Sequence, residues 1–319
     1  MQQSANPQRS ERYRGRISQT FIYLGKLLRM FVYQNDWKVL PMAAVIAGLV
    51  SFVLGANLFK TQEGTMSGCF ALVCVCIWNG FFNSIQVVCR ERSIVKREHR
   101  AGLHISAYIA AHMIYQLLLC LMQTGITIVV LKSAGVQFPE KSLVFPNFET
   151  DLAVSLFLIT YAADMTSLMV SCVVKNTTTA MTVMPFLLIV QLVFSGHFFQ
   201  LEGAAQALTI FTITRWGTQC LCTLGNFNAL PMVALWNMIY RFKDVDMEGY
   251  TPILGLLQYM EEEDQKEAFL AWAGQNNQNP NFNFVPKTLL QCWGVLILFS
   301  LAFALVGMLF LEYVDRDRR

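Results

Sequence analysis

The sequence predicts an all-α polytopic membrane protein: six transmembrane helices preceded by an amphipathic interfacial helix, with a long outer insertion before the last helix. Two observations predict this class. Of the 319 residues, 55% are hydrophobic and only 14% are charged, whereas soluble domains carry about a quarter charged residues. Uncharged runs longer than about 18 residues, enough to cross a bilayer, recur along the chain.

The first residues predict two segments that do not cross the membrane. Residues 1–16 are polar and basic, so we expect a flexible leader or linker without a cleavable signal peptide. Residues 17–35 predict an amphipathic helix, because apolar residues recur at spacings of three and four. Lys26 and Arg29 interrupt this helix, which favours a position in the plane of the inner interface.

Residues 36–319 form the predicted transmembrane domain. Its six spans are 39–59, 65–89, 103–131, 152–174, 177–201 and 288–311. The outer insertion covers about 202–287. Its first part is apolar and predicts short helices in or on the outer leaflet, whereas its second part is acidic at 261–264 and predicts an aqueous segment.

A charged segment, 90–102, separates the second and third spans. It holds five basic and two acidic residues in thirteen positions. The charge-bearing candidates are Arg90, Glu91, Arg92, Lys96, Arg97, Glu98, His99 and Arg100. Short basic loops stay in the cytoplasm, and six spans then place both termini there. We therefore expect a multi-pass protein of the cell membrane with its acidic insertion outside.

The motif search excludes several kinds of chemistry. The chain has no P-loop and no H-E-x-x-H, so it lacks these ATP-binding and zinc-protease patterns. One carboxyl, Asp164, lies inside a predicted span, whereas an aspartyl protease needs two. We expect no catalytic residues, no metal site and no nucleic-acid partner.

The polar residues inside the spans allow more than one reading. Asp164 is either a proton- or cation-carrying group or a structural partner of His112, Gln116 or Asn83. Asn79 and Asn83 share one face of the second span, which suits interhelical hydrogen bonds or a substrate path. A disulfide involving Cys220, Cys222 or Cys292 is also left open.

The order of these elements resembles the membrane domain of ABC exporters of the G subfamily and their bacterial relatives. The resemblance covers nearly the whole chain. It is carried by the motif R-E-R-x-x-x-x-R-E-H-R-A-G followed by Tyr108, by Phe194-Ser195-Gly196, and by Thr214-Arg215-Trp216.

The resemblance implies a transport mechanism. It makes 17–35 the connecting helix and 90–102 the coupling helix, and it places the substrate pathway at Asn79, Asn83, Ile189 and Leu192. The implied gate is Ser195, Gly196, His197 and Phe198. Two departures stand out: a histidine falls in an otherwise apolar gate, and Asn79 replaces a bulky aromatic residue.

The resemblance also implies partners. This chain would be the permease subunit of an ATP-hydrolysing exporter of hydrophobic or amphipathic substrates. It would bind no cofactor itself; ATP and magnesium would lie on a nucleotide-binding domain, either separate or fused upstream. The other partners that the resemblance implies are a second permease copy and membrane lipids. The alternatives are a non-transporting membrane scaffold and a proton-coupled carrier that uses Asp164.

Overall fold

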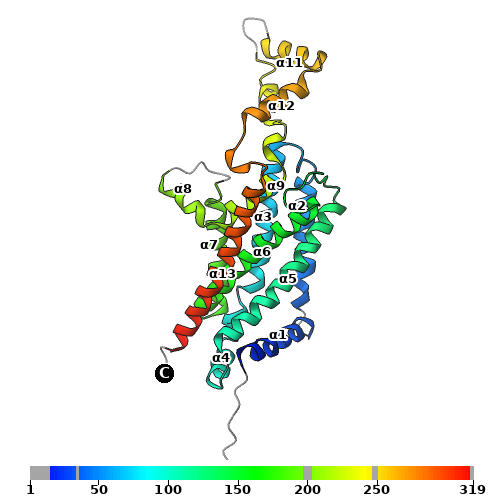
Figure 1. The fold of residues 1–319 in the computed structure, drawn as a ribbon. Helices are drawn as coiled ribbons and strands as arrows, with labels where there is room; N and C mark the ends of the chain where they lie inside the picture. The colour runs from blue at the N-terminus through cyan, green and yellow to red at the C-terminus, as the bar shows by residue number, and fades with distance from the viewer. Residues whose placement is uncertain (1–14, 34–35, 197–202, 246–250, 317–319) are drawn as a thin grey trace, which may run out of the picture.

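The computed structural model describes residues 15–33, 36–196, 203–245 and 251–316. These residues form helices, turns and loops, and no strand occurs among them. The helices make a tall bundle (Figure 1). One end, called the α4 end, carries α1 (Arg16–Tyr33), α4 (Val87–Arg100) and the end of α13 (Pro286–Arg316). The opposite, α11 end carries α11 (Pro252–Glu262) and α12 (Lys266–Asn276).

Five helical segments of the described chain are long and apolar enough to cross a membrane. They are α2 (Val39–Leu54) with the preceding turn η1 (Asp36–Lys38), α3 (Gln62–Ser84) with the α4 that follows it, α5 (Ile105–Ser133), α6 (Phe148–Val173) and α13. The predicted all-α polytopic class is confirmed. The second predicted span was too long at its end, because a turn at Ile85 and Gln86 separates α3 from α4.

The fifth predicted span is shorter than expected. Its helix, α7, covers Thr177–Val193, or 17 residues, rather than 177–201. At about 1.5 Å per residue it is roughly 25 Å long, somewhat less than the hydrocarbon core of about 30 Å. The helix ends before Gly196, whose φ of +74° is a left-handed conformation that stops helices.

The interfacial helix α1 packs against the membrane helix α5. It starts one residue before the predicted 17–35, and residues 34–35 lie outside the described chain. Tyr23 and Leu27 are buried, whereas Ile17 and Phe21 remain exposed. α1 therefore uses only part of its apolar surface within this chain, as an interfacial helix would.

The insertion between α7 and α13 contains several short helices. They are α8 (Ala204–Leu208), η2 (Thr209–Phe211), α9 (Ile213–Leu224), η3 (Phe227–Ala229), α10 (Ala234–Arg241), α11, α12 and η4 (Pro280–Phe282). α9 packs against α3, α6 and α13 and buries Ile213 and Leu221 completely. α11 and α12 instead project beyond the bundle (Figure 1).

The nine cysteines are all free thiols. Cys220 and Cys222 on α9 and Cys292 on α13 have no exposed surface. The disulfide left open for these three residues is therefore not formed, and they fill apolar space as small packing residues.

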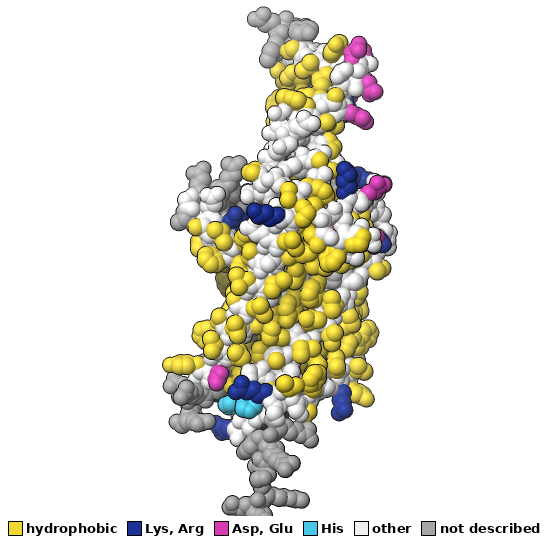
Figure 2. All heavy atoms as spheres, viewed as in Figure 1, with side chains coloured by type: hydrophobic (Ala, Val, Ile, Leu, Met, Phe, Trp, Pro, Cys, Tyr) yellow, Lys and Arg dark blue, Asp and Glu magenta, His cyan; other side chains and the backbone are white. Residues whose placement is uncertain are grey.

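The surface is divided along the long axis of the bundle. Figure 2 shows hydrophobic side chains covering its middle, acidic side chains near the tip at the α11 end, and basic and histidine side chains at the α4 end. Further basic side chains lie where the apolar band ends toward the α11 end. The acidic run 261–264 lies at the end of α11 and in the turn that follows it.

The core is organised around α6, which packs closely against α3 and α13. Gly80 of α3 marks the tightest approach to α6. A Cβ atom there would lie 2.5 Å from the Thr160 carbonyl oxygen and 2.8 Å from the Ala163 Cβ. Small residues of this kind let membrane helices meet backbone to backbone.

Replacing Gly80 by alanine should therefore destabilise the bundle. Overpacking of this kind costs about 1–3 kcal/mol, and it should lower the midpoint of thermal unfolding of the purified protein. Gly125→Ala is the matched control, because no atom lies within 4 Å of its added Cβ. Equal midpoints for the two variants would contradict the close α3–α6 contact.

Candidate functional site

The charged helix α4 has two distinct faces. Its buried residues are Val88, Cys89, Glu91, Arg92 and Val95. Its exposed face carries three arginines and one large apolar side chain: Arg90, Ile94, Arg97 and Arg100. Each set recurs at spacings of about three or four residues, so each occupies one side of the helix. α4 is thus anchored by one side and presents cations on the other.

One turn of α1 holds the two acids of α4, buried Glu91 and half-buried Glu98. Glu98 accepts a hydrogen bond of 2.5 Å from the Tyr23 hydroxyl. The Lys26 ammonium lies 3.2 Å from that hydroxyl oxygen and 3.9 Å from the Glu91 carboxylate. Glu91 is 7% exposed, and a buried carboxylate needs a compensating charge. Lys26 supplies it.

Tyr23 is the residue on which α1, α4 and α5 converge. Burial and then the hydrogen bond to Glu98 raise the pKa of Tyr23 well above its ordinary value. The phenol therefore stays a neutral donor to the carboxylate. Its ring also meets Tyr108 of α5 edge-on, with 5.1 Å between the ring centroids.

The turn that follows α4 is fixed by α1 as well. Gln19 donates a hydrogen bond of 3.0 Å to the Gly102 carbonyl and accepts one of 2.9 Å from the His104 amide. His99 Nδ1 lies 2.8 Å from the Leu103 carbonyl oxygen. Gly102 has a φ of +104°, which favours glycine over other residues.

The buried face of α4 is also fastened to the end of α6. Arg92 donates hydrogen bonds of 3.3 and 2.8 Å to the carbonyls of Cys172 and Val174. Ser171 Oγ accepts from the amides of Val88 and Cys89 at 3.0 and 3.2 Å. Both contacts satisfy backbone groups that helix ends leave unpaired.

Asp164 lies in the bundle core, apart from this junction. Its carboxylate accepts hydrogen bonds from Ser84 Oγ and from Cys120 Sγ, the latter at 3.4 Å. The structural reading expected His112, Gln116 or Asn83 as its partner. Ser84 and Cys120, which the sequence did not single out, make these two contacts, and Asn83 also interacts with the Asp164 carboxyl. No group of three or more His, Cys, Asp or Glu side chains in the described chain could hold a metal ion.

The family model of the ABC-2 type transporter matches residues 25–220. This match begins in α1, ends in α9 and covers more than half of the chain. The chain belongs to the ABC-2 type transporter family. No curated protein matches the chain.

Family membership confirms the resemblance seen in the sequence. The chain is a permease component of an ABC transporter and a multi-pass membrane protein. ABC-2 membrane domains typically pair with an ABC nucleotide-binding partner. The matched region includes α4 with both of its anchors, α1 and α6.

The structure separates the pathway candidates of this ABC-2 permease into two groups. Asn79 and Asn83 are buried, and Asn83 exchanges hydrogen bonds of 2.9 and 3.0 Å with Gln123 of α5. The Asn83–Gln123 pair fits the alternative in which the polar residues of α3 make interhelical hydrogen bonds. Ile189 and Leu192 are exposed on α7, at 54% and 36%. The two groups do not meet on one surface of the single chain.

The open side of α3 carries aromatic residues that sequence analysis missed. Trp78 is 37% exposed, and its ring lies 4.9 Å from that of Phe82. Their spacing of four residues places them on one face of the helix, and this spacing was the signal available in the sequence. An aromatic residue thus does project from this helix, one position before Asn79.

Of the four predicted gate residues, Ser195 and Gly196 lie in the described chain, and His197 and Phe198 lie outside it. Ser195 Oγ donates a hydrogen bond of 2.7 Å to the Leu192 carbonyl. A further residue, Gln191, accepts from the amides of Ile213 and Thr214 at 3.0 and 3.3 Å. This unpredicted contact caps α9 and links it to α7.

Arg92 should matter for stability, whereas Arg90 should not. Arg92→Met would leave the Cys172 and Val174 carbonyls without their donor, at a cost of about 2 kcal/mol for hydrogen bonds to a charged group. Arg90→Met alters an exposed side chain of the same helix and is the control. The midpoint of thermal unfolding measures both, and a similar small shift for the two variants would refute the anchoring contact.

Proposed function

We propose that this permease couples ATP hydrolysis on a partner nucleotide-binding domain to export of a hydrophobic or amphipathic substrate. The observation that carries the proposal is the two-sided α4. Its buried face is fastened to α1 and α6, and its exposed face offers Arg90, Arg97 and Arg100 around Ile94. A helix anchored in this way can be displaced by a partner outside the membrane and can transmit that displacement to the bundle.

The charge distribution supports a cytoplasmic position for α4. Residues 1–38 carry seven basic and two acidic groups, whereas residues 201–287 carry five basic and nine acidic ones. Basic segments are retained in the cytoplasm. With α4 inside, both termini are cytoplasmic, the acidic tip faces outward, and the natural setting is the cell membrane.

The proposed coupling step is a movement of α4 toward its counterpart in a second permease copy. ATP, with its magnesium, would be bound and hydrolysed on the partner domain. Closure of two such domains would displace both α4 helices. Because Arg92 and Ser171 join α4 to α6, the shift would enter the core directly rather than through a loop.

The proposed route for cargo lies between the two copies. α3 is largely buried but leaves Trp78 and Phe82 accessible, and it contacts α7, whose residues Phe186 and Ile189 are widely exposed. An apolar surface interrupted by few polar groups suits amphipathic molecules.

Reversing one charge on the exposed face of α4 should prevent docking. In Arg97→Glu, association with the nucleotide-binding partner should fall about tenfold or more, since placing like charges together at an interface costs several kcal/mol. Co-purification measures this for a separate subunit, and crosslinking from a Ser93→Cys variant measures it for a fused domain. Lys60→Glu, the same reversal in the exposed connection after α2, should leave association unchanged. Undiminished association in Arg97→Glu would remove the docking assignment.

Breaking the Tyr23–Glu98 contact should uncouple the transporter. Glu98→Ala should abolish export from proteoliposomes while membrane insertion and ATP hydrolysis persist, and Tyr23→Phe should weaken export through the same lost hydrogen bond. Glu98→Gln keeps an acceptor and should be less impaired. Wild-type export in Glu98→Ala would exclude the coupling role. A pH-driven flux without ATP that Asp164→Asn abolishes would instead favour the proton-coupled carrier.

A further inference from the structure

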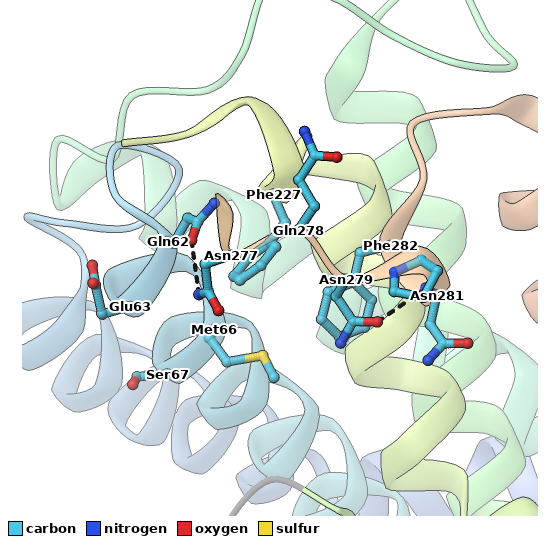
Figure 3. A pocket seen from close by; sticks show the side chains of 11 residues that line it. Gln62, Glu63, Met66, Ser67, Phe227, Asn277, Gln278, Asn279, Asn281 and Phe282 are labelled. Atoms are coloured by element: carbon cyan, nitrogen blue, oxygen red, sulfur yellow. Dashed lines mark hydrogen bonds between the residues drawn. The ribbon is translucent and has the colours of Figure 1, made fainter. Parts of the chain in front are cut away.

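A cavity of about 620 Å³ opens at the α11 end, between the start of α3 and the segment 277–282. Figure 3 shows α3 side chains on one side and the loop residues on the other. Its volume lies within the usual range of small-molecule sites, about 300–1,000 Å³. The lining residues that bear on its chemistry are Glu63, Met66, Ser67, Phe227, Gln278 and Asn281.

The walls of the cavity are held by hydrogen bonds between distant parts of the chain. Gln62 is buried; it donates to the Gly274 carbonyl at 2.9 Å and accepts from the Asn277 amide group at 3.1 Å. Asn279 receives its own support from Asn228, whose Oδ1 accepts from the Asn279 backbone at 2.9 Å. The cavity is thus preorganised, which lowers the entropy lost when a ligand binds.

The polar groups of the lining are almost entirely uncharged. Among the described residues, no Lys, Arg or His lines the cavity, so this lining lacks the groups that bind phosphate or carboxylate ligands. The carboxylate in the described lining, Glu63, already accepts from the amides of Val233 and Ala234 at 3.2 and 2.7 Å. A carboxylate so occupied is a poor ligand for a cation and repels an anion.

The remaining chemistry matches a sugar. Asn and Gln amides each provide donors and an acceptor, as hydroxyl groups do. Met66, Phe227 and Phe282 add apolar contact for the C–H surface of a ring. We propose that this cavity binds a carbohydrate, a neutral polyhydroxylated ring, either free or as the headgroup of a lipid. The site does not depend on the proposed export function.

Two lining side chains can be changed without removing a support of the cavity. The walls use the backbone of Asn281, which donates to Asn279 Oδ1 and accepts from Gln219, rather than its side chain. Gln278 is exposed. The double variant Gln278→Leu, Asn281→Leu therefore removes amides and keeps the frame. Ser67→Phe fills the cavity from the opposite wall, and Gln275→Leu changes an exposed amide outside it.

The experiment uses the full-length protein in lipid nanodiscs, with maltose, octyl maltoside below its micelle concentration, and octyl phosphate as probes. Saturation-transfer NMR and calorimetry should show saturable binding of octyl maltoside and none of octyl phosphate. The double variant should weaken binding about tenfold or more, Ser67→Phe should abolish it, and Gln275→Leu should leave it unchanged.

The two sugar probes separate the sources of the ligand. Binding of maltose as well as octyl maltoside supports a free carbohydrate, and binding of octyl maltoside alone supports a glycolipid headgroup. Binding of neither sugar overturns the proposal. Equal binding of octyl phosphate, or wild-type affinity in the double variant and in Ser67→Phe, overturns it too. None of these outcomes bears on export, which the α4 variants test separately.

Discussion

Charges that cannot enter hydrocarbon determine how this chain is arranged. α4 carries so many ionised groups that it must stay at the membrane surface, yet it is joined through short turns to α3 and α5, which cross the membrane. Its inward charges are then shielded from water and need partners. Lys26 and Tyr23 serve the two acids, and backbone carbonyls of α6 serve Arg92. One surface helix is thereby locked to two others.

This arrangement joins the surface helix α4 firmly to a closely packed bundle. α4 touches α6 through Arg92 and Ser171, and α6 touches α3 so closely at Gly80 that no side chain fits between them. Close-packed interiors transmit displacement because they yield little. Gln191 extends the connection from α7 to α9. Contact is therefore continuous from the charged surface helix to the helices at the opposite end.

Hydropathy and charge were sufficient to predict the fold class, most helix boundaries to within about five residues with the end of α7 as the exception, and the basic helix at one end. They could not predict which side of each helix is covered, because that depends on neighbours distant in sequence. Asp164 was expected to have an interhelical partner, but Ser84 and Cys120 are too common in such helices to be singled out beforehand. The early end of α7 depends on a backbone angle at Gly196, which apolar composition does not reveal.

The exposed side of α3 shows why structure adds to composition in a membrane protein. Exposed apolar residues on α2 or α13 need no explanation, since lipid covers them as well as protein does. α3 differs because most of its surface is enclosed by α2, α6 and α9. Trp78 and Phe82 nevertheless remain accessible on this enclosed helix, and the neighbouring α7 is short and buries few of its residues. These aromatic side chains fit an inner surface shared with a second copy better than a surface that faces bulk lipid. Ser67, which lines the amide-lined cavity, lies on the same face of α3 as Trp78 and Phe82. The accessible face of α3 therefore connects the proposed route with the proposed sugar site.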